Sequence, residues 1–268
     1  MNKIKTFALL LAGAVCLSAC CEKQSAYPKA EGSIRLLQYN VGVFSKHMEN
    51  SMPMLADMVL ELQADIVGVN ELDSCNTRHN SFQCEDFAKE LGGWNYQFSR
   101  AIPYKGGSYG NGVVCPEAFE HVETIMLDKG EGSETRCAIM VETEKYVYLA
   151  THLDHTDEAT CINQANTITA AVKARYADSD KPVFLAGDMN STPDNIVMTT
   201  FAQDWNIISD TTVLTASCPN PKVCIDFILA LKNNAQYEVL GSKVPVCFES
   251  GNVETASDHY PIFVDVKL

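Results

Sequence analysis

The segment from Val183 to Asn190 places two polar side chains of catalytic type directly after a run of apolar residues. It reads Val-Phe-Leu-Ala-Gly-Asp-Met-Asn, so Asp188 and Asn190 follow a glycine and stand two positions apart. Residues two apart on an extended chain point to the same side, so one site at the end of a strand can see both. A carboxylate can orient or deprotonate water, and a carboxamide can hold that water or a metal ligand without adding charge. A turn or a helix cap is the alternative interpretation.

The same arrangement recurs along the chain. Other polar residues of catalytic type end apolar segments at Asn40, Glu71, His152, Asp226, Asp258 and His259. Each one alone is explained by a turn, a cap or a hydrogen-bonded polar group. An ordered set of Asn, Glu, His, Asp/Asn, Asp and Asp/His at strand ends is hard to obtain by chance.

This order of motifs resembles the endonuclease/exonuclease/phosphatase superfamily, which has the DNase I-like fold. The segments that carry the resemblance are Leu-Gln-Tyr-Asn-Val (37–41), Val-Asn-Glu-Leu-Asp (69–73), Tyr-Gly-Asn-Gly (109–112), Thr-His-Leu-Asp (151–154), Gly-Asp-Met-Asn (187–190), Ile-Asp-Phe-Ile (225–228) and Ser-Asp-His-Tyr-Pro (257–261). They run from about residue 34 to the C-terminus. One departure is Asn70, because relatives usually carry Gln before the metal-binding Glu; we expect no loss of chemistry.

The resemblance implies an α/β fold, a four-layer α/β sandwich in which two stacked mixed β-sheets are flanked by helices. Its site lies at one end of the sheets, where the polar strand ends converge. The residues by themselves indicate only one α/β domain.

The resemblance also assigns a metal site. Glu71 is similar to the main metal ligand, assisted by Asn40 and Asp258. Hard oxygen ligands with few protein contacts suit Mg²⁺, and Mn²⁺ would also fit.

The catalytic roles follow in the same way. Asp188 resembles the residue that aligns and activates the attacking water, and Asn190 holds that water or the phosphate. His259 resembles a phosphate-binding histidine whose tautomer and charge are set by Asp226. His152 resembles the second histidine on the phosphate side.

Further residues match positions that touch the substrate in relatives. Asn111 and Arg136 match phosphate contacts, although a surface ion pair is an equal interpretation of Arg136. Tyr109 is expected to reach the leaving group. The glycine-rich segment 100–110 is expected to be a solvated loop, with contact of its Arg100 and Lys105 to the substrate phosphate as the alternative. Asp73 is expected to be a turn residue and His79 a surface residue, and His155 is expected to have no direct role.

The start of the chain is a separate unit. Residues 1–20 combine Lys3 and Lys5, a short apolar run and the sequence Leu-Ser-Ala-Cys, so they are expected to be a lipoprotein signal peptide with a lipobox whose Cys20 is lipidated. An ordinary signal peptide is the alternative. Residues 21–32 are expected to be a flexible tether and residues 33–268 the phosphoesterase domain. The expected location is the bacterial cell envelope, periplasmic or surface-facing, with attachment to a membrane through the lipid.

The charge of the chain limits its partners. Removal of residues 1–20 takes away two lysines and no acidic residue, so the formal charge changes from −14 to −16. There is no cluster of Lys and Arg, which argues against a stable, extended complex with nucleic acid. A nuclease is still allowed, because bound cations supply local positive charge. We expect a monomer that acts on a phosphate ester.

Eight cysteines lie beyond the expected tether: Cys75, Cys84, Cys115, Cys137, Cys161, Cys218, Cys224 and Cys247. In an exported chain an even number predicts disulfides, and Cys75–Cys84 and Cys218–Cys224 would each enclose a short polar loop. A zinc site is a weaker alternative, because no Cys-x-x-Cys pair occurs.

Hydrophobic periodicity predicts alternating elements. Strands are expected at 34–40, 66–69, 113–115, 137–142, 146–150, 183–186, 225–230, 237–240 and 262–266, and helices at 54–62, 86–91 and 162–176. The strands at 137–142 and 146–150 are expected to form a hairpin.

The predicted reaction is metal-dependent hydrolysis of a phosphoric ester by in-line attack of water on phosphorus, as in a phosphodiesterase, nuclease or phosphatase. A sphingomyelinase-like phospholipid phosphodiesterase is an alternative, although Trp94 and Trp205 are isolated and no aromatic hairpin for membrane insertion is visible. A non-catalytic binding module on the same fold is a distant alternative, because none of the expected catalytic residues is lost.

Overall fold

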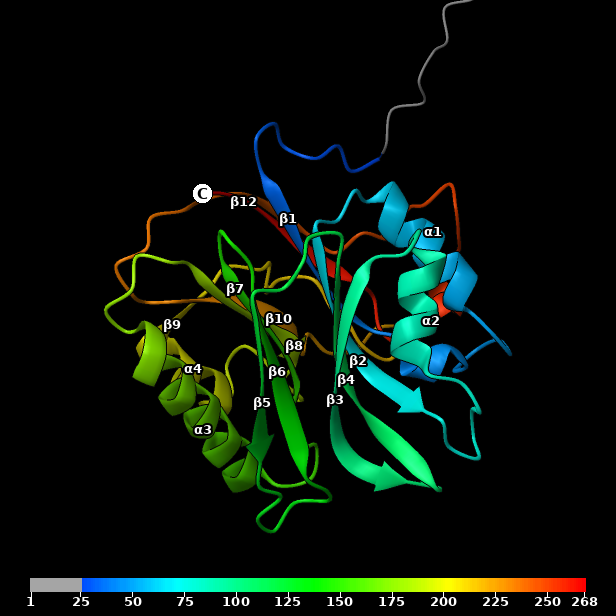
Figure 1. The fold of residues 1–268 in the computed structure, drawn as a ribbon, viewed down its shortest axis with the longest axis horizontal. Helices are drawn as coiled ribbons and strands as arrows, with labels where there is room; N and C mark the ends of the chain where they lie inside the picture. Colours follow the sequence, from blue (N-terminus) through cyan, green and yellow to red (C-terminus); the bar gives the residue numbers. More distant parts are fainter. Residues whose placement is uncertain (1–25) are drawn as a thin grey trace, which may run out of the picture.

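Two six-stranded β-sheets packed face to face form the centre of the computed structural model, which describes residues 26–268 (Figure 1). The first sheet has the strand order β11-β12-β1-β2-β4-β3 and contains β1 (Ile34–Asn40), β2 (Ile66–Ser74), β3 (Asn95–Tyr104), β4 (Gly107–Cys115), β11 (Glu238–Lys243) and β12 (Ile262–Lys267). The second has the order β5-β6-β7-β8-β10-β9 and contains β5 (His121–Leu127), β6 (Arg136–Glu142), β7 (Val147–His152), β8 (Val183–Asp188), β9 (Trp205–Ile207) and β10 (Asp226–Leu231).

Both sheets are mixed in the same way. In each sheet one parallel pair lies near the centre, β1 with β2 and β7 with β8, and the other neighbouring strands are antiparallel. A parallel pair needs a crossover connection. Helix α1 (Met52–Glu61) lies in the first crossover and α3 (Glu158–Tyr176) in the second.

Helices cover the two outer faces, so the fold has four layers (Figure 1). Helices α1 and α2 (Gln83–Glu90) lie on the first sheet, and α3 and α4 (Ile196–Asp204) lie on the second. The short helices η1 (Gly42–Phe44) and α5 (Val253–Ala256) complete the elements of the described residues. The predicted α/β sandwich is therefore confirmed.

Three apolar cores fill the spaces between these layers. One lies under α1 and α2, one lies under α3 and α4, and the third lies between the sheets. Strand β8 shows how alternation divides the side chains: Val183 and Leu185 pack toward the helices, whereas Phe184 and Ala186 pack between the sheets. Asp188 comes next on the same inner face.

The hairpin of β3 and β4 corrects the expected loop at residues 100–110. Strand β3 ends at Tyr104, which pairs with Gly107, and the two residues of the turn have positive φ, 44° at Lys105 and 86° at Gly106. Two positive φ angles are what a tight two-residue hairpin turn requires. Strand β5 and helix α4 were also not predicted, because their short apolar segments have no clear period.

The predicted disulfides do not form, since all eight cysteines in the described part of the chain are free. Cys75 is exposed, whereas Cys84 is buried with its Sγ 3.4 Å from the carbonyl oxygen of Gln97. Cys218 packs in the core under α1 and α2, and Cys224 packs in the core under α3 and α4. Each predicted pair therefore has its two thiols in different surroundings.

Residues 27–32, expected to belong to a tether, lie against the domain. The Tyr27 ring contacts Phe263 with a centroid distance of 6.1 Å, and its hydroxyl accepts the backbone N–H of Val246 at 2.8 Å. The signal peptide, Cys20 and the rest of the expected tether lie outside the described residues. None of the described helices is both long enough and apolar enough to cross a membrane.

A buried ion pair holds the first sheet together at β1 and β12. Arg35 Nε lies 2.7 Å from Asp265 Oδ1 and Arg35 Nη2 lies 2.7 Å from Asp265 Oδ2. Arg35 also donates to the carbonyl oxygens of Leu62, Tyr27 and Pro28. One guanidinium therefore joins both strands, α1 and the segment before β1.

We expect Arg35→Met to destabilise the protein by about 3–5 kcal/mol, because the buried carboxylate of Asp265 loses its partner. Arg175→Met is the matched control: it removes an exposed ion pair with Glu123 and should cost less than about 1 kcal/mol. Urea unfolding measures both free energies. Equal losses in the two variants would contradict the role given to Arg35.

Candidate active site

The predicted catalytic residues meet at one end of the space between the sheets. Asn40 ends β1, His152 ends β7, Asp188 ends β8 and Asp226 begins β10. The residues two positions away from them along the strands, which share the same face, are Gln38, Ala150, Ala186 and Ile228. Period-two alternation thus carries these four polar side chains to the rim of the inner core.

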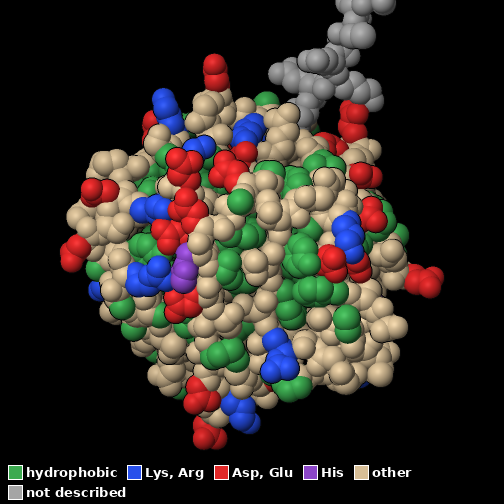
Figure 2. All heavy atoms as spheres, in the orientation of Figure 1, with side chains coloured by type: hydrophobic (Ala, Val, Ile, Leu, Met, Phe, Trp, Pro, Cys, Tyr) green, Lys and Arg blue, Asp and Glu red, His purple; other side chains and the backbone are tan. Residues whose placement is uncertain are grey.

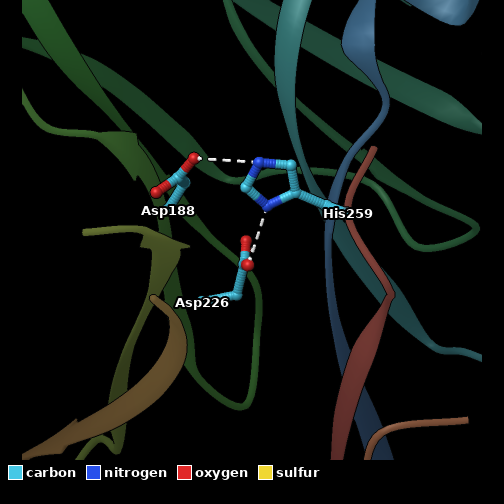
Figure 3. Close-up of side chains that lie close together, drawn as sticks. All are labelled: Asp188, Asp226 and His259. Carbon is cyan, nitrogen blue, oxygen red and sulfur yellow. Dashed lines mark hydrogen bonds and ion pairs between the residues drawn. The ribbon is translucent and has the colours of Figure 1, made fainter. Parts of the chain in front are cut away.

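Asp188, His259 and Asp226 form the buried centre of the site (Figure 3). Asp188 and Asp226 are direct cross-strand neighbours on β8 and β10. His259, from the segment before β12 in the other sheet, lies between the carboxylates, with Nδ1 2.8 Å from Asp226 Oδ2 and Nε2 3.6 Å from Asp188 Oδ2. Thr215 Oγ1 donates to the same Asp226 oxygen at 2.7 Å.

The two histidines of the site have opposite charge states. Burial lowers the pKa of His259, but the carboxylates of Asp226 and Asp188 outweigh it and raise the value to about 10. Burial, with the nearby Arg136 charge, holds the pKa of His152 well below its ordinary value. At neutral pH the His259 ring is therefore a cation and the His152 ring is neutral.

Asp188 is suited to accept a proton. Burial raises its pKa to about 7, although the neighbouring His259 charge acts in the opposite direction. Its Oδ2 faces His152 Nε2 at 3.5 Å, and its Oδ1 accepts the backbone N–H of Asn190 at 3.0 Å. A base with a pKa near the working pH is effective in general base catalysis.

Asn40 and Asn70 hold Glu71 and Asp188 in place through hydrogen bonds. Asn40 Nδ2 donates to Glu71 Oε1 at 3.2 Å and to Asp188 Oδ2 at 3.1 Å, while its Oδ1 accepts the N–H of Gly42. Asn70 Nδ2 donates to the carbonyl oxygen of Thr151 at 2.9 Å, and its Oδ1 accepts the N–H of Asp188. Asn40 thus presents nitrogen, not oxygen, to the site, and Asn70 joins the two sheets.

Glu71 and Asp258 form the acidic side of the site. Strand β2 has an irregular register between Val69 and Leu72, and Glu71 has a φ of 60°. Lys46 Nζ lies 3.5 Å from Glu71 Oε2 and 3.0 Å from Asp258 Oδ2, so both carboxylates converge on one positive charge. This oxygen donor set fits a hard divalent cation.

A second group of metal-ligating side chains is Asp188, Asp226 and His259, whose ligand atoms lie within 4.8 Å of one another. His259 already contacts both carboxylates as a cation. A metal ion there would have to displace that ring proton and its hydrogen bond to Asp226. Glu71 and Asp258 are therefore the better candidates.

A pocket of about 290 Å³ opens above these residues. It is lined by Glu71, Tyr109, Glu134, Arg136, His152, His155, Asp188, Asn190 and His259. Arg136 is buried, with Nη1 3.2 Å from Glu134 Oε1 and Nη2 3.2 Å from His155 Nδ1. Arg136 and His259 thus supply positive charge to the lining of the pocket.

Asn111 does not line this pocket. It is buried, its Oδ1 accepts from Asn70 Nδ2 at 3.0 Å, and its Nδ2 donates to the carbonyl oxygen of Cys137 at 3.0 Å. Both the oxygen and the nitrogen of this side-chain amide are hydrogen-bonded within the protein, so Asn111 holds the Asn70 side chain in position. Asn190 lines the pocket and is fixed by a bond from its Nδ2 to the carbonyl oxygen of Leu153.

Sequence reasoning missed Lys46, Glu134 and the contribution of His155. Lys46 follows Asn40 by six residues, and its proximity to Glu71 depends on a left-handed backbone at Val43 and Phe44. Glu134 lies in a loop whose path is set by Ser133, which donates to Asp154. Arg100 and Lys105 are exposed and do not line the pocket.

The sequence profile of the Endonuclease/Exonuclease/phosphatase family matches residues 37–259. The chain belongs to this family. The match spans every strand end described above from Asn40 to His259. Members of the family are hydrolases that act on phosphate esters, and membership indicates the same class of reaction here. None of the curated proteins matches the chain.

Solved structures of other proteins have the same fold. A mannosyl-6-phosphatase from Bacteroides thetaiotaomicron has a TM-score of 0.73 at 17% identity, covering 88% of this chain and all of that one. The catalytic domain of human Nocturnin with bound sulfate has a TM-score of 0.67 at 17% identity, covering 89% and 96%. TDP2 from D. rerio, in a complex with a single-strand DNA product, has a TM-score of 0.67 at 13% identity, covering 89% and 100%.

We expect the two imidazole rings to differ in ¹⁵N NMR spectra of the metal-free protein at pH 7. His259 should show two protonated ring nitrogens up to about pH 10. His152 should show the signature of a neutral ring. Since the pKa of folded His259 lies above its ordinary 6.5, its stabilising ion pair is complete below that pH and is lost as pH rises through about 10.

Asp226→Asn provides the control for this measurement. It removes one carboxylate beside His259 and should lower that pKa, while His152 stays neutral. A neutral His259 ring at pH 7 in the wild-type protein would contradict the assignment of a cationic His259 between Asp188 and Asp226.

Proposed function

We propose that the protein is a metal-dependent phosphoesterase that hydrolyses a phosphate ester by attack of water on phosphorus. The observation that carries this proposal is the position of Asp188, a proton acceptor that lies between a neutral His152 and a cationic His259 at the base of a pocket. A non-catalytic binding role would not require a buried carboxylate with a pKa near 7.

Arg136 and His259 are proposed to bind the phosphate. Both are cationic and both line the pocket, and each is itself buried and held by a carboxylate, Arg136 by Glu134 and His259 by Asp226, so their charge is fixed in place before a substrate arrives. Prearranged donors stabilise the negative charge that grows on phosphorus-bound oxygens. The phosphate would lie beside these two side chains.

Asp188 is proposed to take a proton from the attacking water. Asn190 lines the same pocket, and its backbone N–H fixes the orientation of the Asp188 carboxylate. Neutral His152 faces Asp188 and does not compete for that proton, because burial keeps its basicity low. The hydroxyl of Tyr109 remains neutral, since burial raises its pKa well above the ordinary value. It can therefore donate a hydrogen bond to the leaving oxygen.

Glu71 and Asp258 are proposed to hold Mg²⁺, with Mn²⁺ as a substitute. Such an ion would offset the phosphate charge and polarise the ester. Asn40 would position the Glu71 carboxylate through its Nδ2. Lys46 adds a positive charge next to both carboxylates.

The surface offers little to an extended nucleic acid. On the face shown in Figure 2, Lys and Arg side chains are scattered and many lie beside Asp or Glu. With a formal charge of −14, this favours small phosphate esters over long polynucleotides. One fold relative is named a mannosyl-6-phosphatase, which makes sugar phosphates reasonable first substrates.

We expect activity to vanish in EDTA and to return with Mg²⁺ or Mn²⁺. Glu71→Gln should raise the metal concentration needed for half-maximal activity, because it removes one anionic ligand. Asp188→Asn should lower kcat by at least about 10²-fold at every metal concentration. Assays should compare sugar phosphates, nucleoside monophosphates, DNA, RNA and sphingomyelin.

Two results would overturn the proposal. One is full turnover in EDTA. The other is near-normal kcat for Asp188→Asn on the best substrate. Circular dichroism of both variants controls for loss of folding.

We also propose that the protein acts outside the cytoplasm, attached to a membrane through Cys20. This rests on the sequence alone. Cys20→Ser should leave the precursor unprocessed or release the protein, because stable membrane attachment needs two or more acyl chains. Mass spectrometry of the mature N-terminus provides the measurement, and an unmodified terminus after Cys20 would indicate an ordinary secreted protein. Cys21→Ser is the matched control and should be lipidated normally.

A further inference from the structure

A second pocket of about 170 Å³ adjoins the active-site pocket. It is lined by Arg78, Ile102, Tyr104, Tyr109 and Glu134, and it shares Tyr109 and Glu134 with the first. A substrate whose phosphate lies beside Arg136 can therefore extend its leaving group past Tyr109 into this space. We call these five residues the ring subsite.

The ring subsite is built on the β3–β4 hairpin, which pairs with β2 (Figure 1). Tyr104 and Tyr109 have ring centroids 6.1 Å apart with an interplanar angle of 50°. The Arg78 guanidinium carbon lies 4.7 Å from the Tyr104 centroid and 5.7 Å from the Tyr109 centroid. The subsite is thus lined by two aromatic rings, a guanidinium plane and the aliphatic side chain of Ile102, with the Glu134 carboxylate as a further polar group.

A buried carboxylate fixes Arg78 in this position. Asp73 Oδ2 accepts from Arg78 Nε at 2.7 Å, and Asp73 Oδ1 accepts from Arg78 Nη2 at 2.8 Å. His79 Nδ1 lies 2.7 Å from the same carboxylate. Asp73 and His79, expected to be turn and surface residues, thus hold a side chain that lines the pocket.

The charges of the ring subsite disfavour a second phosphate. Its only cation among the described lining residues, Arg78, is already paired with Asp73, and Glu134 adds a carboxylate at the entrance. An anionic group would lose its hydration beside the Glu134 carboxylate and would have to share Arg78 with Asp73. The leaving group that fits is neutral.

The surfaces of the ring subsite favour a hydroxylated ring. The negative face of an aromatic ring attracts C–H groups, which a sugar ring presents on its flat side. Glu134 can accept hydroxyl protons, and Arg78 retains N–H groups that can donate. A pocket of aromatic walls with a few polar groups is the usual form of a small-molecule site.

We propose that the ring subsite binds the sugar ring of a sugar phosphate whose phosphate lies between Arg136 and His259, an inference that rests on the proposed phosphoesterase function. The oxygen of water bonds to phosphorus, and the bond from phosphorus to the sugar oxygen breaks. Of the two protons of the water, one ends on the sugar oxygen, which leaves as an alcohol, and the other ends on the phosphate. The products are the free sugar and inorganic phosphate.

Binding and turnover separate this inference from the function it rests on. Isothermal titration calorimetry with the Asp188→Asn protein compares a hexose 6-phosphate with inorganic phosphate. The hexose phosphate should bind at least about tenfold more tightly, and adding Tyr104→Leu should remove that gain. Arg100→Ala, an exposed residue of the same hairpin outside both pockets, is the matched control and should retain it.

In kinetic assays, Tyr104→Leu should reduce the ratio of kcat/KM for hexose 6-phosphate to that for glycerol phosphate by about tenfold. The inference is wrong if the hexose adds no affinity, or if Tyr104→Leu leaves the gain intact. It is also wrong if a nucleoside monophosphate binds more tightly through Tyr104. Absence of turnover on every ester, with sugar-dependent binding retained, would contradict the proposed function and not the subsite.

Discussion

The two carboxylates of Asp188 and Asp226 lie side by side in the nearly closed space between the sheets, and this arrangement constrains the rest of the molecule. Neighbouring buried carboxylates repel one another and lose hydration, so they need a cation between them. His259 supplies it from the opposite sheet. The segment before β12 must therefore reach across to β8 and β10, which fixes how the two sheets stack at this end.

Side-chain alternation then determines which groups reach the site. Apolar residues fill most of the inner faces of both sheets, and polar residues replace them toward the end that holds the site. Asn70 adds a bond from β2 to the backbone of β7 and β8. Glu71, the next residue, reaches the same rim because β2 is irregular there and its φ is positive. Strain of this kind persists where surrounding contacts hold it.

The sequence predicted the fold and most of the site because both depend on local patterns. Asp188, Asp226, His152 and His259 were found from residue type and from their place after apolar segments. Lys46, Glu134 and Tyr104 were not found, because their positions depend on loop paths and on a hairpin turn with two positive φ angles. The cysteines misled for a related reason: short spacing along the chain does not show that Cys218 and Cys224 face different cores.

The order of strands has a consequence for synthesis. The second sheet is formed by one continuous stretch, β5 to β10, whereas the first combines β1 to β4 with β11 and β12. Ile34 pairs with Val266, a contact between distant parts of the chain that makes for high contact order and slow folding. Asn40 ends β1 and His259 comes just before β12, so both catalytic residues depend on the pairing of these two strands. During synthesis, all strands of the second sheet leave the ribosome before β12 does. A nascent chain at that stage can form the second sheet, but it lacks His259 and therefore has no complete catalytic centre.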